Sequence, residues 1–266
     1  MHSAPEALDH QPSLTIAVLT LNSATHIRAC LESAAFADQV LVVDSGSTDD
    51  TLKIAEAMDA EVHVHADWQG FAEQRNRLLK HAAGDYIFFL DSDEIIGPKL
   101  RQEIQTIVSS GADGVWKIRW RIVAFGRELT YFRSNSEVER LFVRRTVRCF
   151  TGVVHEQAEL TAALPRHVMR ARLLHHSRET VAASLQKMTQ YAMLGAAKRA
   201  EHCQRGGVLR GLASGGWMFF RLYFLHRGFL SGGAGFLYCA FFSLEAFFRY
   251  AALGYDKDLK GDVRRK

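Results

Sequence analysis

Three carboxylates follow a short apolar segment in the first third of the chain. Residues 86–90 read Tyr-Ile-Phe-Phe-Leu, which predicts a strand buried on both faces of a parallel sheet. Asp91, Asp93 and Glu94 come directly after it. Side chains two apart in an extended chain point the same way, so Asp91 and Asp93 can reach one cation. Mg²⁺ binds in this manner, through one or two protein carboxylates, waters and the oxygens of a diphosphate. The pattern predicts a cation site where open α/β sheets bind their ligands.

The same acidic residues have a simpler interpretation. Asp-x-Asp is a common pattern, and a helix is expected soon afterwards, with Pro98 near its start. Acidic side chains in a turn before a helix can cap its free N–H groups. The surrounding elements therefore have to support the cation interpretation.

The elements before residue 91 alternate between predicted strands and helices. Strands are expected over residues 14–21, 40–43 and 61–65, and helices occupy the stretches that follow each of them. Such alternation builds a parallel sheet through right-handed crossovers. The second strand leads into Asp44-Ser45-Gly46-Ser47, where the glycine permits a tight turn.

The pattern changes after the acidic turn. Residues 116–123 alternate apolar side chains with Lys117, Arg119, Arg121 and Val123, which predicts a half-buried strand with one basic face. Further strands are expected near 139–144, 147–151 and 168–175. This part of the core is expected to be more antiparallel than the first. From residue 179 onward the pattern is helical.

The C-terminal helices are rich in aromatic residues. Residues 217–225 and 236–248 are dense in Phe, Trp and Tyr, interrupted by Arg221, Arg227 and Arg249. No apolar run is long enough to predict a simple membrane span. The mixture is typical of helices that lie in a membrane interface, with the arginines at head-group level. A helical hairpin packed on the rest of the protein is the alternative.

Composition excludes several classes. With 266 residues and 48% hydrophobic content, the chain can form one large domain, or one domain and an appendage. Four scattered cysteines predict neither a zinc site nor disulfides and fit a reducing cytosol. A net charge of +4 does not indicate a nucleic-acid partner. Residues 1–13 are polar, contain two prolines and lack the layout of a signal peptide, so a loose tail is expected.

Three segments in order resemble family 2 glycosyltransferases with the GT-A fold. They are LTIAVLTLN at 14–22, VLVVDSGSTDDT at 40–51 and GDYIFFLDSDE at 84–94. Together with FAEQRN at 71–76, they resemble the bacterial branch that adds glucose to the lipopolysaccharide inner core. The resemblance implies a Rossmann-like, mostly parallel sheet with an antiparallel acceptor-side portion over residues 14–178. It also implies a helical, membrane-interfacial region over residues 179–266.

The resemblance implies a donor site at the ends of two strands. Asp44 and Ser45 would hold the nucleotide, although many members carry a second acidic residue against the uracil where this chain has Ser45. Asp91 and Asp93 would hold Mg²⁺ or Mn²⁺ on the donor diphosphate. Three consecutive residues match a family segment close to the nucleotide: Gln74, Arg75 and Asn76. For Arg75 the alternative is an arginine on the helix surface that pairs with Glu73 or another neighbour.

Sugar transfer also needs a group that takes the proton of the attacking hydroxyl. Glu156, at the end of Gly152-Val153-Val154-His155-Glu156, resembles the family's base position. The rivals are Glu94, which is expected nearer the donor, and His155. An ordinary loop glutamate is the simpler interpretation. The sequence also predicts a basic rim on the acceptor side, with a solvated strand face as the alternative for about half of its arginines: Arg140, Arg144, Arg145, Arg148, Arg166, Arg170 and Arg172.

The expected function is an inverting, metal-dependent glycosyltransferase at the cytoplasmic face of the inner membrane. It would move a hexose, glucose from UDP-glucose, to a lipopolysaccharide inner-core sugar, with an anionic membrane surface and no nucleic acid among its partners. The alternatives are transfer to a polyprenyl-phosphate carrier or another envelope glycan, and a non-catalytic membrane protein that binds sugar nucleotides. A dinucleotide oxidoreductase is disfavoured because no G-x-G-x-x-G follows the first strand.

Overall fold

The computed structural model describes residues 11–134, 136–152, 156–256 and 259. The chain divides into two compact units. Unit 1 comprises Met1–Trp120 with Ser136–Leu174, and unit 2 comprises Arg121–Asn135 with His175–Lys266. Most of the expected tail at residues 1–13 lies outside the described residues, as does His155. The expected domain boundary at residue 178 stays a prediction.

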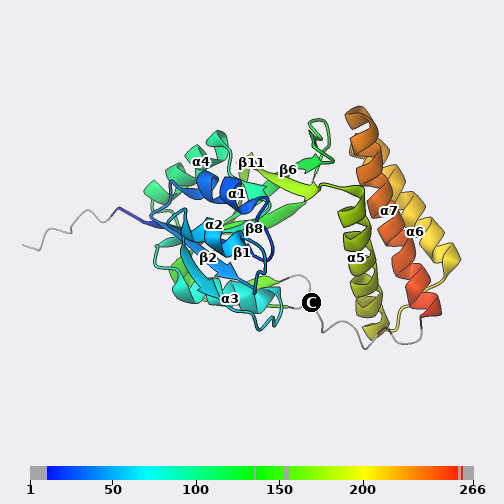
Figure 1. Cartoon of the computed structure of the whole chain (residues 1–266), viewed down its shortest axis with the longest axis horizontal. Coiled ribbons are helices and arrows are strands. Elements are labelled where there is room, and N and C mark those ends of the chain that lie inside the picture. Colours follow the sequence, from blue (N-terminus) through cyan, green and yellow to red (C-terminus); the bar gives the residue numbers. More distant parts are fainter. Residues whose placement is uncertain (1–10, 135, 153–155, 257–258, 260–266) are drawn as a thin grey trace, which may run out of the picture. The chain divides into compact units, whose positions relative to one another are not determined.

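Unit 1 is built on a parallel sheet that alternates with helices (Figure 1). Its parallel strands, in spatial order, are β3 (Glu61–Val64), β2 (Gln39–Asp44), β1 (Leu14–Thr20) and β4 (Tyr86–Asp91). The connecting helices are α1 (Ile27–Ala34), α2 (Thr51–Glu56) and α3 (Phe71–His81). The predicted strand–helix alternation is confirmed.

The strands are apolar on both faces because each face packs against its own layer. Phe88 of β4 joins the core under α1 and α4 (Pro98–Ser109), whereas Phe89 joins the core under α3. Figure 1 shows α3 on the other side of the sheet from α1 and α4. Gly84 lets β4 start beside β1, because a Cβ there would lie 2.6 Å from the backbone nitrogen of Thr15. The almost unbroken apolar run of β4 follows from this double burial.

The sheet continues through antiparallel strands. β8 (Glu137–Val143) pairs antiparallel with β4, and β6 (Val115–Ala124) pairs antiparallel with β8. Beyond them follow β11 (Arg166–Arg178) and β5 (Glu94–Ile95). The remaining short elements are β7 (Arg127–Glu128), η1 (Arg144–Thr146), β9 (Val147–Thr151) and β10 (Gln157–Leu160). The predicted mixed α/β fold, with its parallel and antiparallel portions, is confirmed.

Unit 2 is mostly helical, as the sequence predicted. Its helices are α5 (Val181–Glu201), α6 (Val208–Phe220), the π-helical η2 (Arg221–Leu225), η3 (Gly228–Ser231) and α7 (Gly232–Tyr255). Both α5 and α6 pack against α7. Among the described residues, one helix, over Gly228–Tyr255, is long and apolar enough to cross a membrane by length and composition. No span was expected here, because the apolar runs are too short and are interrupted by charged residues such as Glu245 and Arg249.

Candidate functional site

The carboxyl ends of β2 and β4 flank the end of β1. Asp44 is in register with Thr20 of β1, and Asp91 is in register with Leu19. Parallel strands end at the same edge of a sheet, so the loop after Asp44 and the acidic turn after Asp91 begin beside each other. This edge is where open α/β sheets bind ligands.

Asp44 shapes its own loop. Its Oδ1 accepts hydrogen bonds from the backbone N–H groups of Gly46 (2.8 Å) and Ser47 (2.7 Å), and its Oδ2 accepts one from the Ser47 hydroxyl. The side chain is fully buried. Gly46 has a φ of +97°, in the left-handed region that favours glycine. The carboxylate therefore holds the loop in one conformation, and the sequence pattern Asp-Ser-Gly-Ser is what that conformation requires.

The segment at residues 74–76 reaches three different parts of unit 1. The buried Gln74 donates from Nε2 to the Ser45 hydroxyl oxygen at 2.8 Å, which supports the loop after β2. Asn76 exchanges two hydrogen bonds with the backbone of Phe150, at 3.1 Å and 2.7 Å, and so joins α3 to β9. Between them, Arg75 points toward the carboxylates at the sheet edge.

Arg75 links the two carboxylates expected to act on donor and acceptor. Its Nε donates to Glu156 Oε1 at 2.8 Å, and its Nη2 lies 3.9 Å from Asp91 Oδ1. The guanidinium lies 5.2 Å from the Phe89 ring centre and 5.8 Å from that of Phe150, within cation–π range. The side chain is buried, so the alternative of a surface arginine is wrong.

Arg140 holds the acidic turn from the core side. This fully buried side chain donates from Nη2 to Asp91 Oδ2 at 2.6 Å and to Glu94 Oε1 at 2.7 Å. Burial alone would lower the pKa of the guanidinium, but the charges of Asp91 and Glu94 outweigh it and raise that pKa above its ordinary value. Arg140 is thus a permanent buried cation and not part of a basic rim, which corrects that expectation.

Glu94 is committed to this network. Its side chain is fully buried, and Oε1 also accepts a hydrogen bond from Trp120 Nε1 at 2.6 Å. Its Oε2 accepts one from the backbone N–H of Asp91 at 3.0 Å. Glu94 therefore fixes the turn, and neither cation binding nor proton transfer to an acceptor suits a group so enclosed.

Asp91 and Asp93 are the carboxylates of the turn that remain accessible. The Asp91 side chain is 43% exposed and Asp93 is half-buried. Burial, the largest cause, raises the pKa of the Cys30 thiol, and the negative charges of Glu94, Asp91 and Asp93 raise it further. Two accessible carboxylates at the end of a buried strand fit a hard cation that keeps water or diphosphate oxygens as its other ligands.

Glu156 lies directly after residues 153–155, which are outside the described residues. Its side chain is 20% exposed and is held through Oε1 by Arg75. The structure thus brings together Asp91, Arg75 and Glu156, and joins Ser45 to Gln74. The roles of Arg140 and Trp120 in this network were not predicted from the sequence. One signal in the sequence could have indicated a buried arginine. Arg140 directly precedes three apolar residues, Leu141, Phe142 and Val143, in an expected strand.

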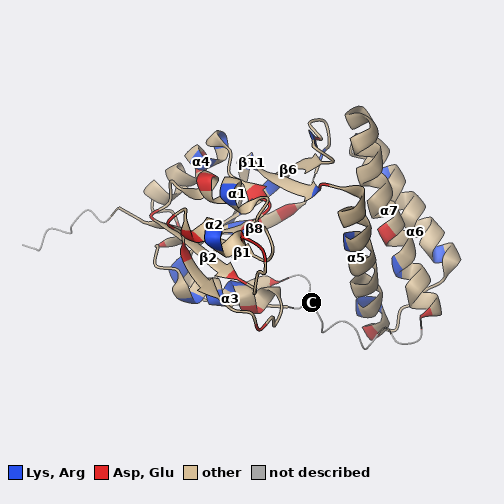
Figure 2. Ribbon diagram, in the orientation of Figure 1, with Lys and Arg blue, Asp and Glu red and all other residues tan. Residues whose placement is uncertain are grey.

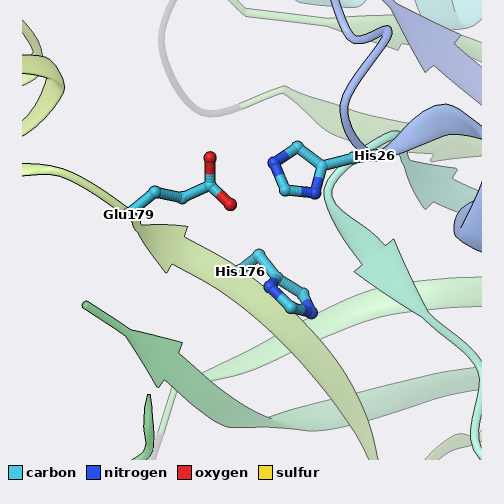
Figure 3. Close-up of side chains that lie close together, drawn as sticks. All are labelled: His26, His176 and Glu179. Carbon is cyan, nitrogen blue, oxygen red and sulfur yellow. The ribbon is translucent and has the colours of Figure 1, made fainter. Parts of the chain in front are cut away.

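Two other groups of side chains contain metal-binding residue types. Glu61, His63 and His81 come together at β3, but the rings of His63 and His81 stack at 3.6 Å, and one ion cannot lie in the plane of both stacked rings. Figure 3 draws His176 and Glu179, which belong to unit 2, together with His26 of unit 1. These three residues come from different units, so they do not define a metal site within either unit.

Comparison with known proteins identifies the class. The model of the family "Glycosyl transferase family 2" matches residues 15–172, which is more than half of the chain. The chain belongs to this family and is a glycosyltransferase, as its motifs predicted.

The relatives span most of the chain. An uncharacterized glycosyltransferase of Rickettsia felis is 25% identical over 254 residues, covering 89% of this chain and 87% of that protein. The lipopolysaccharide core biosynthesis glycosyltransferase LpsC of Rhizobium meliloti is 24% identical over 239 residues, covering 84% and 85%.

Solved structures match over a smaller share. TarS of S. aureus in complex with UDP-GlcNAc gives a TM-score of 0.47 at 22% identity, over 63% of this chain and 59% of that one. Glucosyl-3-phosphoglycerate synthase of Mycobacterium tuberculosis, with Mn²⁺, UDP and glucosyl-3-phosphoglycerate, gives 0.46 at 18% identity, over 63% and 73%. This chain spans less than two thirds of the TarS chain.

Proposed function

We propose that the protein transfers a hexose, expected to be glucose, from a nucleotide-sugar donor to a lipopolysaccharide inner-core sugar, with inversion at the anomeric carbon. The observation that carries this is the accessible Asp91 carboxylate at the end of β4, clamped by the buried Arg140 and joined through Arg75 to Glu156. The relationship to LpsC supports the acceptor, and the proposal includes a reaction at the cytoplasmic face of the inner membrane.

The donor would be a uridine diphosphate sugar. The loop of Asp44 and Ser45, supported by Gln74, would receive the nucleotide at the carboxyl edge of the sheet. Many family members have an acidic residue where this chain has Ser45. A neutral hydroxyl would therefore face the uracil of the donor in this protein. The ligands named for TarS and for glucosyl-3-phosphoglycerate synthase, UDP-GlcNAc and UDP, support this donor class.

Asp91 and Asp93 would hold Mg²⁺ or Mn²⁺, which supplies positive charge to the departing diphosphate. Arg140 occupies Oδ2 of Asp91 and fixes its carboxylate, so the ligand position does not have to be organised when the donor binds. Arg75 lies on the Oδ1 side of Asp91 and would add a second positive charge to the leaving group. Both arginines are buried, which strengthens their effect on charge that develops nearby.

Glu156 would be the general base. Its Oε1 is held by Arg75, and we assign Oε2 to the proton of the acceptor hydroxyl. The enclosure of Glu94 by Arg140 and Trp120 argues against that rival. Arg75 would then act on both sides of the reaction, orienting the base while it contributes charge beside Asp91.

A transfer assay tests the proposal. The full chain is incubated with UDP-glucose, UDP-galactose or UDP-GlcNAc, Mn²⁺ and lipopolysaccharide truncated within the inner core, and the glycan mass is measured. The proposal predicts addition of one hexose from UDP-glucose. Transfer of N-acetylhexosamine alone, or donor hydrolysis without any transfer to this acceptor, would contradict it.

A further inference from the structure

Unit 2 presents large apolar side chains on the outside of its helices. On α6, η2 and η3 the exposed set includes Leu209, Leu212, Trp217, Phe224, Leu225 and Phe229, which we name the hairpin face. Leu209 is 82% exposed and Trp217 is 59% exposed. Ring contacts join Trp217, Phe224 and Phe229 through Phe220. Exposed apolar surface of this kind is unusual on a soluble monomer and indicates a partner.

The inner side of α6 is made of small residues. Its buried residues are Gly211 and Gly215, which face α7. A Cβ on Gly211 would lie 2.9 Å from the carbonyl oxygen of Phe247, and one on Gly215 would lie 2.9 Å from that of Ser243. Small residues inside and large apolar residues outside reverse the usual arrangement in water, and G-x-x-x-G contacts of this type are frequent between helices in lipid.

The charges of this segment have one sign. Residues 202–244 contain Arg205, Arg210, Arg221 and Arg227 but no aspartate, glutamate or lysine. All four arginines are exposed. Figure 2 shows α6 as a mostly tan ribbon with few coloured positions, which agrees with the low number of charged residues in this segment. The surface is complementary to anionic lipid head groups.

Arg249 does not belong to this set, although the sequence analysis placed it at head-group level. Its side chain is only 20% exposed and donates to Glu245 at 2.6 Å. Glu245 also lies 3.5 Å from Arg178, so these charges form an internal network in unit 2. The basic residues near the start of α6 are Arg205, which precedes the helix, and Arg210, in its first turn.

We propose that the hairpin face docks in the head-group region of an anionic bilayer, with α6 lying along the interface. The stretch between Arg210 and Arg221 is about three helical turns, roughly 16 Å, which is too short to cross ~30 Å of hydrocarbon. Docking needs neither donor nor metal, so it goes beyond the proposed transfer reaction. If that reaction acts on a lipid-linked glycan, docking keeps the enzyme at the surface that carries the acceptor.

Vesicle flotation of the full chain without nucleotide tests the inference. Vesicles of equal phosphatidylcholine and phosphatidylglycerol should bind the protein, vesicles of phosphatidylcholine alone should bind it much less, and high salt should weaken binding. Leu212→Glu should reduce binding at least about tenfold, because it places a charge where docking would bury an apolar side chain in the bilayer. Arg210→Gln should reduce it roughly fivefold on anionic vesicles only.

Leu185→Glu on α5 is the matched control, since Leu185 and Leu212 are 47% and 57% exposed. It should bind vesicles like the unmodified chain. Absence of flotation, or equal losses in the two variants, would overturn the inference. Sedimentation of the unmodified chain as a dimer that Leu212→Glu dissociates, without vesicle binding, would overturn it too, because a second copy would then cover the face.

Discussion

The Asp91 carboxylate is held by two arginines that enter from different elements. Arg140 on β8 donates to Oδ2, and Arg75 on α3 lies beside Oδ1. A buried arginine paired with two carboxylates does little for net stability, because desolvation offsets most of the attraction. Removing one partner, however, leaves a buried charge uncompensated. The network is therefore best understood as a device that fixes the position of Asp91.

Arg140→Met tests this role. The substitution leaves the fully buried Glu94 without its cationic partner, so the free energy of unfolding should fall by about 3–5 kcal/mol. The control is Arg145→Met, whose exposed ion pair with Asp113 should contribute about 0–1 kcal/mol. Urea unfolding of the two variants measures both values. Similar losses in the two variants would show that Glu94 does not depend on Arg140 to compensate its buried charge.

Glu156→Gln tests the assignment of the base. Loss of a general base costs roughly 10²- to 10⁴-fold in rate, while the neutral side chain still accepts a hydrogen bond from Arg75. We expect kcat to fall by that factor and donor affinity to stay nearly unchanged. Glu159→Gln, on β10, should leave turnover intact. A Glu156→Gln enzyme with near-normal kcat, or one that loses donor binding in proportion, would exclude Glu156 as the base.

The functional residues of unit 1 are carried by elements that have separate structural reasons to lie where they do. β2 and β4 are driven into the sheet by apolar side chains on both faces, so Asp44 and Asp91 emerge together at its edge. α3 is tied to β9 through Asn76 and to the loop after β2 through Gln74. Because its neighbours in the sequence are attached in this way, Arg75 is held beside Asp91 and Glu156. In unit 2, the glycines of α6 set its distance from α7.

The two kinds of glycine on α6 give a matched comparison. Gly211→Ala should destabilise the helices of unit 2, because the new Cβ would meet the Phe247 carbonyl oxygen at 2.9 Å. Nothing lies within 4 Å of a Cβ at Gly216, so Gly216→Ala should stabilise by about 1 kcal/mol through helix propensity alone. Thermal melts followed by circular dichroism should therefore shift in opposite directions. Equal upward shifts would show that α6 and α7 do not pack this closely.

Sequence patterns predicted the fold better than the connections within the site. The apolar runs of β1, β2 and β4 and the acidic turn at Asp91 and Asp93 carry local signals. The pairing of Arg75 with Glu156 has no local signal, because Glu156 lies on a loop far along the chain. Arg140 and Arg145 look alike in the sequence, yet one is fully buried and the other is exposed. Which arginine faces the core depends on strand register, and the charge pattern alone does not specify it.

At the scale of the whole molecule, two activities are assigned to two units. Unit 1 carries the carboxylates and arginines of the proposed transfer site, and unit 2 carries the hairpin face. The assignments are separable by experiment, because vesicle binding needs no nucleotide and donor binding needs no vesicle. A variant of the hairpin face should therefore keep its affinity for the donor, and a variant of the acidic turn should still float with anionic vesicles.

The central claim is that Asp91 and Asp93 bind a divalent ion on the donor diphosphate. The most direct measurement is calorimetric titration of the full chain with UDP-glucose, with and without Mn²⁺. The control is Asp59→Asn, an exposed position whose φ of 55° suits asparagine, and it should bind like the unmodified chain. Affinity should rise with Mn²⁺ in the unmodified chain and in this control, and that rise should vanish in Asp91→Asn and in Asp93→Asn. If Asp93→Asn shows the same gain from Mn²⁺ as the unmodified chain, the metal assignment is contradicted.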